Sequence, residues 1–300
     1  MGGFSKDRRK FLIGLAVFGG ATALQPYLAM PALAAGGTIS RSTNDDPYRA
    51  AKAAVEALGG MSRFVKKGQK VCILPNLGWA RTPEQGACTN PRVLRAVVHM
   101  CEVAGAKSID VYCNPCNDAR VCYEKSGAVE ALKDTTARLQ YISSNGWVSV
   151  NAPRSAKVMK SNDVYRLTTE ADVLINVPIL KHHGGAQVTM CMKNLMGAVR
   201  DRDLMHQDLT NSIPDAVSMI KSHLCILDAS RILMKNGPSG GNVKDVVVKR
   251  IVFAGVNPVE VDALGAELYG VAPSSIKHIA EAGARGMGEI NTKNLNVKIA

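Results

Sequence analysis

The sequence predicts an α/β fold, with a largely parallel or mixed sheet flanked by helices, in one domain or in two closely packed α/β halves. Three observations predict it. Short apolar runs alternate along the chain with helix-like segments, as in folds built from strand–helix–strand units. Several helix-like segments begin with Asn or Asp followed by Pro, which favour a helix start. Apolar residues make up 46% of the 300 residues, enough for a large buried core.

The first 34 residues have the pattern of an export signal. Arg8 and Arg9 directly precede an apolar run over residues 11–24, and Ala-Leu-Ala at 32–34 is typical of a signal-peptidase site. The order Asp-Arg-Arg-Lys-Phe-Leu resembles the twin-arginine signal, and an ordinary secretory signal is the alternative. We expect a periplasmic or otherwise extracytoplasmic protein that binds the twin-arginine translocase during export. No stable transmembrane segment is expected after cleavage, because a spanning helix needs about 20 apolar residues.

The chain after the signal begins with two predicted helices, each followed by a predicted strand. DDPYRAAKAAVEALGG is predicted as a helix with an Asp cap, an early Pro and a Gly-Gly end, and KVCILPN is the strand after it. NPRVLRAVVHMCEVAGA repeats the pattern, with Asn90 as cap, Pro91 in the first turn and Gly105 at the end. SIDVYC is then predicted as a buried strand.

The rest of the chain continues the alternation. The apolar runs DVLINVPIL, HLCILDA and RIVFAGV are predicted strands, and NPVEVDALGAELYG is a predicted helix that Asn257 caps. Polar loops follow four of the strands, namely LPNLGWARTP, CNPCNDARVC, LKHHGG and ASRILMKNGPSGG. Because sites in α/β folds lie beyond the carboxyl ends of the strands, we expect these loops to meet at one edge of the sheet.

The chain is basic, with a formal net charge of +12. Basic charge can indicate nucleic-acid binding. Here the lysines are scattered and aromatic residues are only 5% of the chain, so we expect no nucleic acid as a partner. A small anionic ligand or a redox partner protein is the expected kind of partner.

The stretch PILKHHGGAQVTMCMKNLMG is the first candidate site. His182 and His183 are adjacent, so on an extended segment they point to opposite faces and only one of them reaches a site. Lysine and asparagine side chains here can contact an anionic group, and histidines can bind metal or move a proton near neutral pH. The candidate catalytic residues are His183, Lys193, His206 and Asp228, and the candidate cofactor-binding residues are Lys181, His182, Asn194 and Asn76. A structural turn is the alternative.

The cysteines form the second candidate site. Cys113-Asn-Pro-Cys116 can hold one metal ion or one edge of a cluster, with Cys122 six residues on and Cys88 from a neighbouring loop as further ligands. A second Cys-x-x-Cys is missing, so neither the zinc-ribbon nor the ferredoxin pattern is met. Disulfides, a redox-active pair and inert thiols are the alternatives.

Several ordered motifs resemble the domain-of-unknown-function family 362. They are LPN at 74–76, TNPRVLRAVV, EVAGA, ADVLINVPILKHH, MKNLMGAV with a following histidine, LDA, NGPSGG and NPVEVDA. The resemblance implies one family domain over residues 35–300. Members usually have Lys-Pro-Asn where this chain has Leu74-Pro75-Asn76, so a role for a lysine there is in doubt.

A fainter similarity is to nickel-pincer lactate racemases. It lies in the order His183, Lys193, Gly197 and His206, and in ILPNLGWARTP. In that family histidines face a nickel cofactor and a lysine holds it covalently. The similarity implies a nickel-type cofactor as an alternative to an iron–sulfur cluster or another metal.

Three functions follow from these observations as hypotheses. The first is an exported metal- or iron–sulfur-binding protein of extracytoplasmic redox metabolism. The second is a cofactor-dependent isomerase or hydride-transfer enzyme acting on a small hydroxy acid. The third is a non-catalytic binding or assembly protein held by disulfides.

Overall fold

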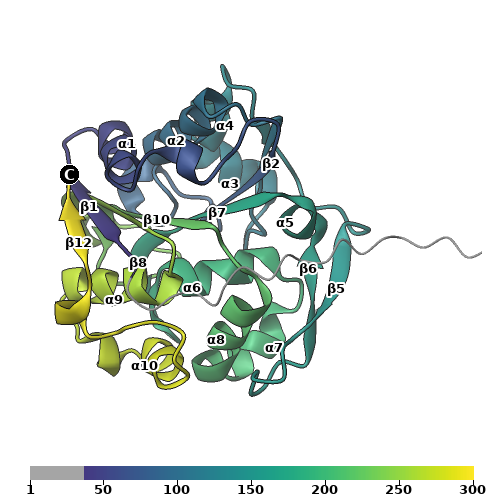
Figure 1. Ribbon diagram of the computed structural model, residues 1–300, viewed down its shortest axis with the longest axis vertical. Coiled ribbons are helices and arrows are strands. Elements are labelled where there is room, and N and C mark those ends of the chain that lie inside the picture. Colours follow the sequence, from purple (N-terminus) through teal and green to yellow (C-terminus); the bar gives the residue numbers. More distant parts are fainter. Residues whose placement is uncertain (1–36) are drawn as a thin grey trace, which may run out of the picture. The chain divides into compact units, whose positions relative to one another are not determined.

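A ten-stranded mixed sheet organises residues 37–300, the part of the chain that this computed structural model describes (Figure 1). Eight strands form its main path, in the order β12-β1-β11-β10-β7-β2-β3-β4. They are β1 (Ile39–Thr43), β2 (Lys70–Pro75), β3 (Ser108–Val111), β4 (Arg138–Leu139), β7 (Val173–Val177), β10 (Leu224–Leu233), β11 (Val246–Gly255) and β12 (Val297–Ile299). The export signal predicted for residues 1–34 lies outside the described residues.

The sheet is parallel at its centre and antiparallel towards one side. Strands β10, β7, β2, β3 and β4 are parallel neighbours, whereas β11 runs antiparallel to both β10 and β1. The prediction of an α/β fold with a largely parallel or mixed sheet is therefore confirmed.

Two strands leave the main path and a further pair forms a separate ribbon. β8 (Ile179–His183) pairs in parallel with β10 and antiparallel with β9 (Gln187–Thr189). β5 (Trp147–Asn151) and β6 (Ser161–Tyr165) form the separate two-stranded sheet. β8 directly follows β7 in the chain and pairs with a later part of β10. The chain then turns back at the β8–β9 hairpin.

The three predicted helix caps are present. Asp46 accepts the backbone N–H of Tyr48 at the start of α1 (Pro47–Ala57), and Asn90 accepts that of Arg92 at the start of α2 (Pro91–Val103). Asn257 caps α9 (Pro258–Tyr269) in the same way. The other helices are α3 (Ala119–Lys125), α4 (Ala128–Leu132), α5 (Arg166–Glu170), α6 (Cys191–Asn194), α7 (Arg202–Gln207), α8 (Leu209–Met219) and α10 (Lys277–Ala284).

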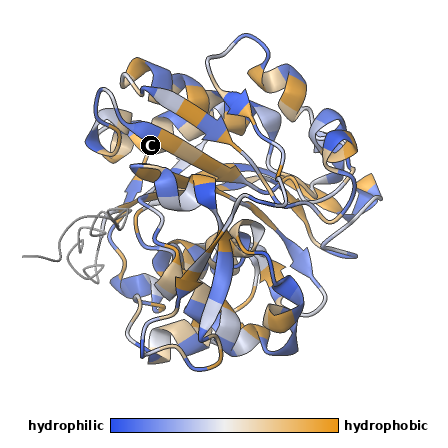
Figure 2. Ribbon diagram, turned by 90° about the vertical axis from the view of Figure 1, so that its right-hand side faces the viewer, coloured by the Kyte–Doolittle hydropathy of each residue, from blue (hydrophilic) through white to orange (hydrophobic). Residues whose placement is uncertain are grey.

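Helices pack on both faces of the sheet, so the described residues form three layers. In Figure 1, α1 and α2 lie on one side of the central strands, and α6, α8, α9 and α10 lie on the other. Each side has its own buried apolar cluster. Figure 2 shows apolar residues along the strands between the two helix layers. Among residues 37–300, no helix combines the length and apolar character needed to cross a membrane.

Candidate functional site

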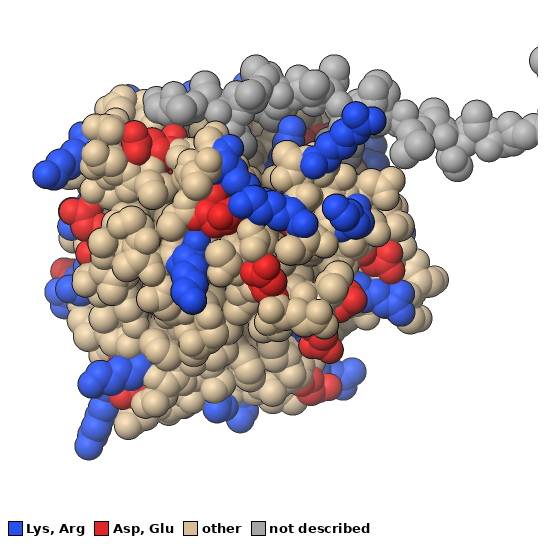
Figure 3. Space-filling view, turned by 90° about the horizontal axis from the view of Figure 1, so that it is seen from below, with Lys and Arg blue, Asp and Glu red and all other residues tan. Residues whose placement is uncertain are grey.

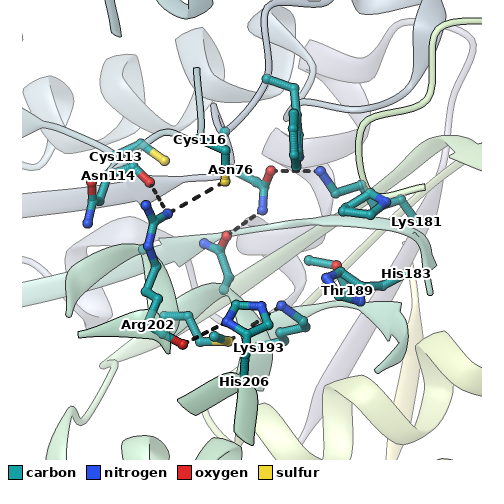
Figure 4. Close-up of a pocket in the computed structure, with 16 residues that line it drawn as sticks. Asn76, Cys113, Asn114, Cys116, Lys181, His183, Thr189, Lys193, Arg202 and His206 are labelled. Atoms are coloured by element: carbon teal, nitrogen blue, oxygen red, sulfur yellow. Dashed lines mark hydrogen bonds between the residues drawn. The ribbon is translucent and has the colours of Figure 1, made fainter. Parts of the chain in front are cut away.

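A cavity of about 250 Å³ lies where the loops after β2 and β3 meet the β8–β9 hairpin and helices α6 and α7 (Figure 4). Its lining residues are Asn76, Gly78, Trp79, Cys113, Asn114, Cys116, Lys181, His183, Thr189, Lys193, Asn194, Met196, Gly197, Arg202, His206 and Pro238. All four segments that were predicted as loops contribute to this lining. The prediction of a loop was wrong for most of LKHHGG, which is strand β8, and for the start of ASRILMKNGPSGG, which is the end of β10. The cavity lies beyond the carboxyl ends of the parallel strands, where α/β proteins place their sites.

Strand β8 presents alternate side chains to the cavity. Lys181 and His183 line it, whereas His182 between them receives a hydrogen bond at its Nδ1 from the backbone N–H of Gly237, at 3.1 Å. Only glycine fits at 237, because a Cβ there would lie 2.0 Å from the carbonyl oxygen of His182. The structure thus places His182 away from the cavity to which the sequence assigned it.

Helix α6 projects Lys193 and Asn194 into the cavity because Asp262 of α9 holds its first residues. The two carboxylate oxygens of Asp262 accept the backbone N–H groups of Cys191 at 2.7 Å and Met192 at 2.9 Å. Asp262 is fully buried, and burial raises its pKa to about 7. A carboxylate from a distant helix therefore fixes the direction in which α6 presents its side chains.

Lys193 carries a buried positive charge with a weak partner. Its side chain is 8% exposed, and its Nζ donates to the sulfur of Met196 at 3.4 Å. Burial, together with the positive charges of Lys181 and Arg202, lowers the pKa of Lys193 to about 8. Among the described residues, none of those that line the cavity is acidic, so the ammonium group faces the cavity without an ion-pair partner.

Lys181 is fixed by a chain of amide groups. Its Nζ donates to Oδ1 of Asn76 at 3.0 Å and to the carbonyl oxygen of Ala87. Asn76 donates in turn to Oδ1 of Asn194 at 2.9 Å, and Asn194 donates to Oδ1 of Asn176 at 2.8 Å. Burial lowers the pKa of Lys181 to about 8. This chain joins the end of β2, the middle of β7 and helix α6 into one rigid wall.

The hydrogen bonds of His183 determine its tautomer. The backbone N–H groups of Gly185 and Ala186 both donate to its Nδ1, at 3.1 Å each, so Nδ1 carries no proton. The proton of the neutral ring must then be on Nε2. Burial and the neighbouring lysines lower the pKa of His183 to about 3, so the ring is neutral at ordinary pH. His183 can therefore offer the cavity an N–H donor.

His206 has the opposite tautomer. Its Nδ1 lies 2.7 Å from the carbonyl oxygen of Arg202, which can only accept, so Nδ1 carries the proton. The Nε2 atom of the neutral ring is left with a lone pair that can accept a proton. The two imidazole rings are stacked, with centroids 6.4 Å apart. One cavity thus holds an imidazole donor and an imidazole acceptor.

Arg202 joins α7 to the loop after β3. Its Nη1 donates to the carbonyl oxygen of Asn114 at 2.8 Å and to the sulfur of Cys116 at 3.7 Å (Figure 4). Its Nη2 donates to the carbonyl oxygen of Pro115 at 3.4 Å. The guanidinium group adds a third positive charge to the lining beside the two lysines.

The four cysteines predicted as metal ligands divide into two pairs. Cys113 and Cys116 line the cavity, whereas Cys88 and Cys122 are buried outside its lining. The thiol of Cys88 donates to the carbonyl oxygen of Trp79 at 3.2 Å, and burial raises the pKa of Cys122 to about 11. Within residues 37–300, no group of three or more His, Cys, Asp or Glu side chains is arranged to hold a metal ion. The metal centre stays a prediction.

Asp228 is the predicted catalytic residue that does not line the cavity. It is fully buried in β10, and its carboxylate accepts the backbone N–H groups of Asn90 at 2.8 Å and Ser230 at 2.9 Å. Burial raises the pKa of this carboxyl group. The structure gives Asp228 a role in holding the start of α2 against the sheet.

The sequence did not single out several lining residues. The polar ones among them are Asn114, Thr189 and Arg202, and the conformationally rigid one is Pro238. Thr189 lies inside the predicted stretch, residues 178–197, and Arg202 lies between its end and the predicted site residue His206. No pattern in the sequence marked them as more than surface polar residues.

A family model and one relative match this chain. The model of the family described as "Domain of unknown function (DUF362)" matches residues 71–267. A thylakoid-associated protein of Synechocystis sp. is 30% identical over 204 residues, which are 64% of this chain and 61% of that protein. The chain therefore spans less than two thirds of the length of that relative.

Two solved structures resemble the chain at low identity. One is the lactate racemase apoprotein from Thermoanaerobacterium thermosaccharolyticum, with a TM-score of 0.47 and 14% identity over 79% of this chain and 57% of that one. The other is a Thermotoga maritima protein from a structural genomics consortium, with a TM-score of 0.47 and 12% identity over 76% of this chain and 60% of that one. The first is a lactate racemase, the class to which the sequence showed similarity. Nothing about the chemistry of this chain follows from either likeness.

Proposed function

The chain belongs to the DUF362 family, and from the chemistry of its cavity we propose that it binds a small organic anion and moves a proton on it. The observation that carries the proposal is Lys193, a buried ammonium group on the wall of the cavity whose hydrogen-bond acceptor is a methionine sulfur. A buried charge without a strong acceptor is costly. A carboxylate in the cavity supplies that acceptor.

The rest of the lining supports an anion. Lys181 and Arg202 add positive charge, and Asn76 and Asn194 add amide groups that the hydrogen-bond chain holds in place. Charge-assisted hydrogen bonds from lysine and arginine to a carboxylate are among the stronger ones in proteins. A cavity of about 250 Å³ suits an acid of a few carbon atoms. Small hydroxy acids are within this class.

The two histidines supply the proton chemistry. The free Nε2 of His206 can accept a proton from the bound acid, while the Nε2–H of His183 can donate a hydrogen bond to the oxygen on which negative charge develops. The lysine ammonium groups stabilise the same charge. The proposed reaction class is therefore isomerisation or another proton transfer next to a carboxylate.

The first prediction concerns pH. Lys193 and Lys181 each have a pKa lowered to about 8, so they are protonated below that pH and neutral above it. The affinity for a carboxylate will therefore be highest below about pH 8 and will fall as the pH rises, with proton uptake on binding near pH 8. Calorimetry with acetate, glycolate and malonate, in buffers of different ionisation enthalpy, measures both effects.

The ligand itself does not titrate in this range, because carboxylic acids are ionised well below neutral pH. A fall in affinity between neutral and alkaline pH must then come from the protein. An affinity that stays constant from about pH 7 to pH 10 would contradict the proposal, as would the failure of every small carboxylate and of inorganic phosphate to bind.

A metal-bearing redox protein is the second candidate. In its favour, two thiols and two imidazoles line one cavity, and Cys113 and Cys116 with His183 or His206 are the residues that would bind an iron–sulfur cluster, another metal or a nickel-type cofactor. The described residues bring no three such side chains together as ligands, so we derive no step through such a group. A non-catalytic binding or assembly protein is the third candidate, and anion binding without any proton transfer would favour it.

We propose no nucleic-acid partner for this chain. On the face seen in Figure 3, Lys and Arg side chains are interspersed with Asp and Glu side chains, whereas nucleic-acid-binding faces gather basic residues. The net charge of +12 instead favours the approach of small anions from a distance. A redox partner protein stays a prediction.

The second prediction concerns export through the twin-arginine pathway to the periplasm or another extracytoplasmic compartment. Replacing Arg8 and Arg9 together with Lys keeps the positive charge but removes the pair that the translocase recognises. We expect the double variant to accumulate in the cytoplasm, measured by fractionation and immunoblotting. The single variant Lys6→Arg is the matched control and should be exported normally. Normal export of the double lysine variant would rule out this pathway.

A further inference from the structure

We propose that Cys113 and Cys116 form a redox-active dithiol, which a low-molecular-weight disulfide oxidises to an intramolecular disulfide. This goes beyond the proposed anion chemistry and does not depend on it. Both cysteines line the cavity, at the spacing Cys-Asn-Pro-Cys in the loop after β3. Pairs at this spacing are the usual form of exchangeable dithiols, because only two residues separate the cysteines and the disulfide closes a small ring.

The two thiols differ in the way that such a pair requires. Cys116 is exposed, and its sulfur lies 3.7 Å from Nη1 of Arg202. Its exposure leaves this sulfur open to a small molecule in solution. Cys116 is therefore the thiol that attacks an incoming disulfide.

Cys113 has the properties of the second, resolving thiol. It is 4% exposed, and the backbone N–H of Leu77 donates to its sulfur at 3.4 Å. A small oxidant in solution therefore reaches Cys116 first, and Cys113 reacts only with a sulfur that is already inside the cavity.

The reaction balances in two exchange steps. The sulfur of Cys116, after losing its proton, attacks one sulfur of the disulfide R–S–S–R, which forms a mixed disulfide and releases R–S⁻. Cys113 then gives its proton to the released thiolate and attacks the sulfur of Cys116, which closes the protein disulfide and releases the second R–S⁻. The proton that Cys116 lost goes to solvent, and the second R–S⁻ takes one up from solvent. The protein therefore loses two electrons and two protons, and the small disulfide gains them as two thiols.

The charge of the cavity predicts which disulfide reacts best. Lys181, Lys193 and Arg202 line the cavity next to Cys116. An anionic disulfide such as oxidised glutathione, which carries carboxylates, should react faster than the cationic disulfide cystamine, once each rate is divided by its rate with a free cysteine peptide. The normalised preference is expected to be about 10-fold and to shrink as salt is added.

The third prediction is a trapping experiment on the folded chain. The reduced protein is mixed with oxidised glutathione, and products are identified by intact mass and peptide mapping. The wild-type protein should lose two hydrogens and yield a peptide linked through Cys113 and Cys116. Cys113→Ser should stop at a glutathione adduct on Cys116, whereas Cys116→Ser should form neither product in the same time.

Matched controls keep the result interpretable. Cys88→Ser and Cys122→Ser should behave like the wild type, since neither residue lines the cavity, and thermal unfolding must show that every variant is folded. Three outcomes would overturn the proposal: a linked peptide that pairs Cys116 with Cys88 or Cys122, a Cys113→Ser protein without an adduct, or a tightly bound metal on both thiols of the protein purified without oxygen. A failure of the disulfide proposal would not affect the anion-binding proposal, and a failure of anion binding would not affect the disulfide proposal.

Discussion

Replacing Lys193 with Met will lower the affinity for a small carboxylate by about 10- to 100-fold at neutral pH, the effect of losing one charge-assisted hydrogen bond. Methionine keeps the length and the apolar stem of the side chain but removes its ammonium group. Calorimetry with the tightest-binding acid of the carboxylate panel measures the change. Lys52→Met, on the exposed face of α1, removes one charge outside the cavity and should leave the affinity unchanged.

The same replacement will stabilise the fold. The pKa of Lys193 is about 8 in the folded protein, against 10.5 for an ordinary lysine, so folding disfavours its charged form. The unfolding free energy of the Met variant at neutral pH should therefore exceed that of the wild type by about 3 kcal/mol. This gain is present below about pH 8 and disappears as the pH rises towards 10.5, where the lysine is neutral in both states. Denaturant unfolding at neutral and alkaline pH measures it.

Loss of binding together with gain of stability is the signature of a residue kept for function. A Met variant that binds acids as well as the wild type does would remove Lys193 from the site. A variant that is less stable at neutral pH would show instead that the ammonium group has a structural partner, and the buried-charge account of the cavity would be wrong.

Replacing His206 with Asn will lower the rate of proton transfer on the bound acid by about 100- to 10,000-fold, the usual contribution of a general base, while leaving the acid bound. The Nδ2–H of Asn can still donate to the carbonyl oxygen of Arg202, but Asn has no atom in the place of Nε2. Exchange of a ligand C–H for deuterium in D₂O, followed by NMR, measures the rate. Calorimetry measures the binding.

Two further variants separate the roles of the histidines. His183→Gln keeps an N–H donor near the position of Nε2, so it should retain more activity than His183→Ala. His182→Asn changes the neighbouring residue of β8, which faces Gly237 and not the cavity, and should leave both rate and affinity unchanged. A His206→Asn protein that exchanges deuterium at the wild-type rate would show that another group takes the proton.

Much of the fold could be predicted because local chemistry decides it. The caps at Asp46, Asn90 and Asn257 are short-range hydrogen bonds between a side chain and a nearby backbone N–H, so the sequence alone identifies them. The buried strands are visible as apolar runs. The antiparallel pairing of β11 with β1 places Ser40 opposite Ala254, and no local pattern reveals pairing between segments so far apart in the chain.

The site could be predicted in part, for the same reason. The position of Lys181 and His183 on one face of β8 follows from the two-residue period of a strand. The position of Asp228 could not be predicted, because its carboxylate accepts the backbone N–H of Asn90, which is 138 residues away in the chain. Arg202 escaped prediction because its contacts with Asn114 and Cys116 form only when α7 packs beside the loop after β3.

The structure explains how the chain accommodates Leu74 in place of lysine. Where the family resemblance leads us to expect lysine, Leu74 is fully buried in the apolar core, in strand β2. The positive charges of this cavity come from Lys181, Lys193 and Arg202 instead, and none of them depends on a lysine at 74.

The central claim is that Lys193 binds the carboxylate of a small acid, and a crystal structure of the wild-type protein with the tightest-binding acid of the panel tests it most directly. The proposal predicts a carboxylate oxygen within hydrogen-bonding distance of Nζ of Lys193, with the acid in reach of the Nε2 atoms of His183 and His206. An acid found elsewhere on the protein, with the cavity holding only water, would contradict the claim.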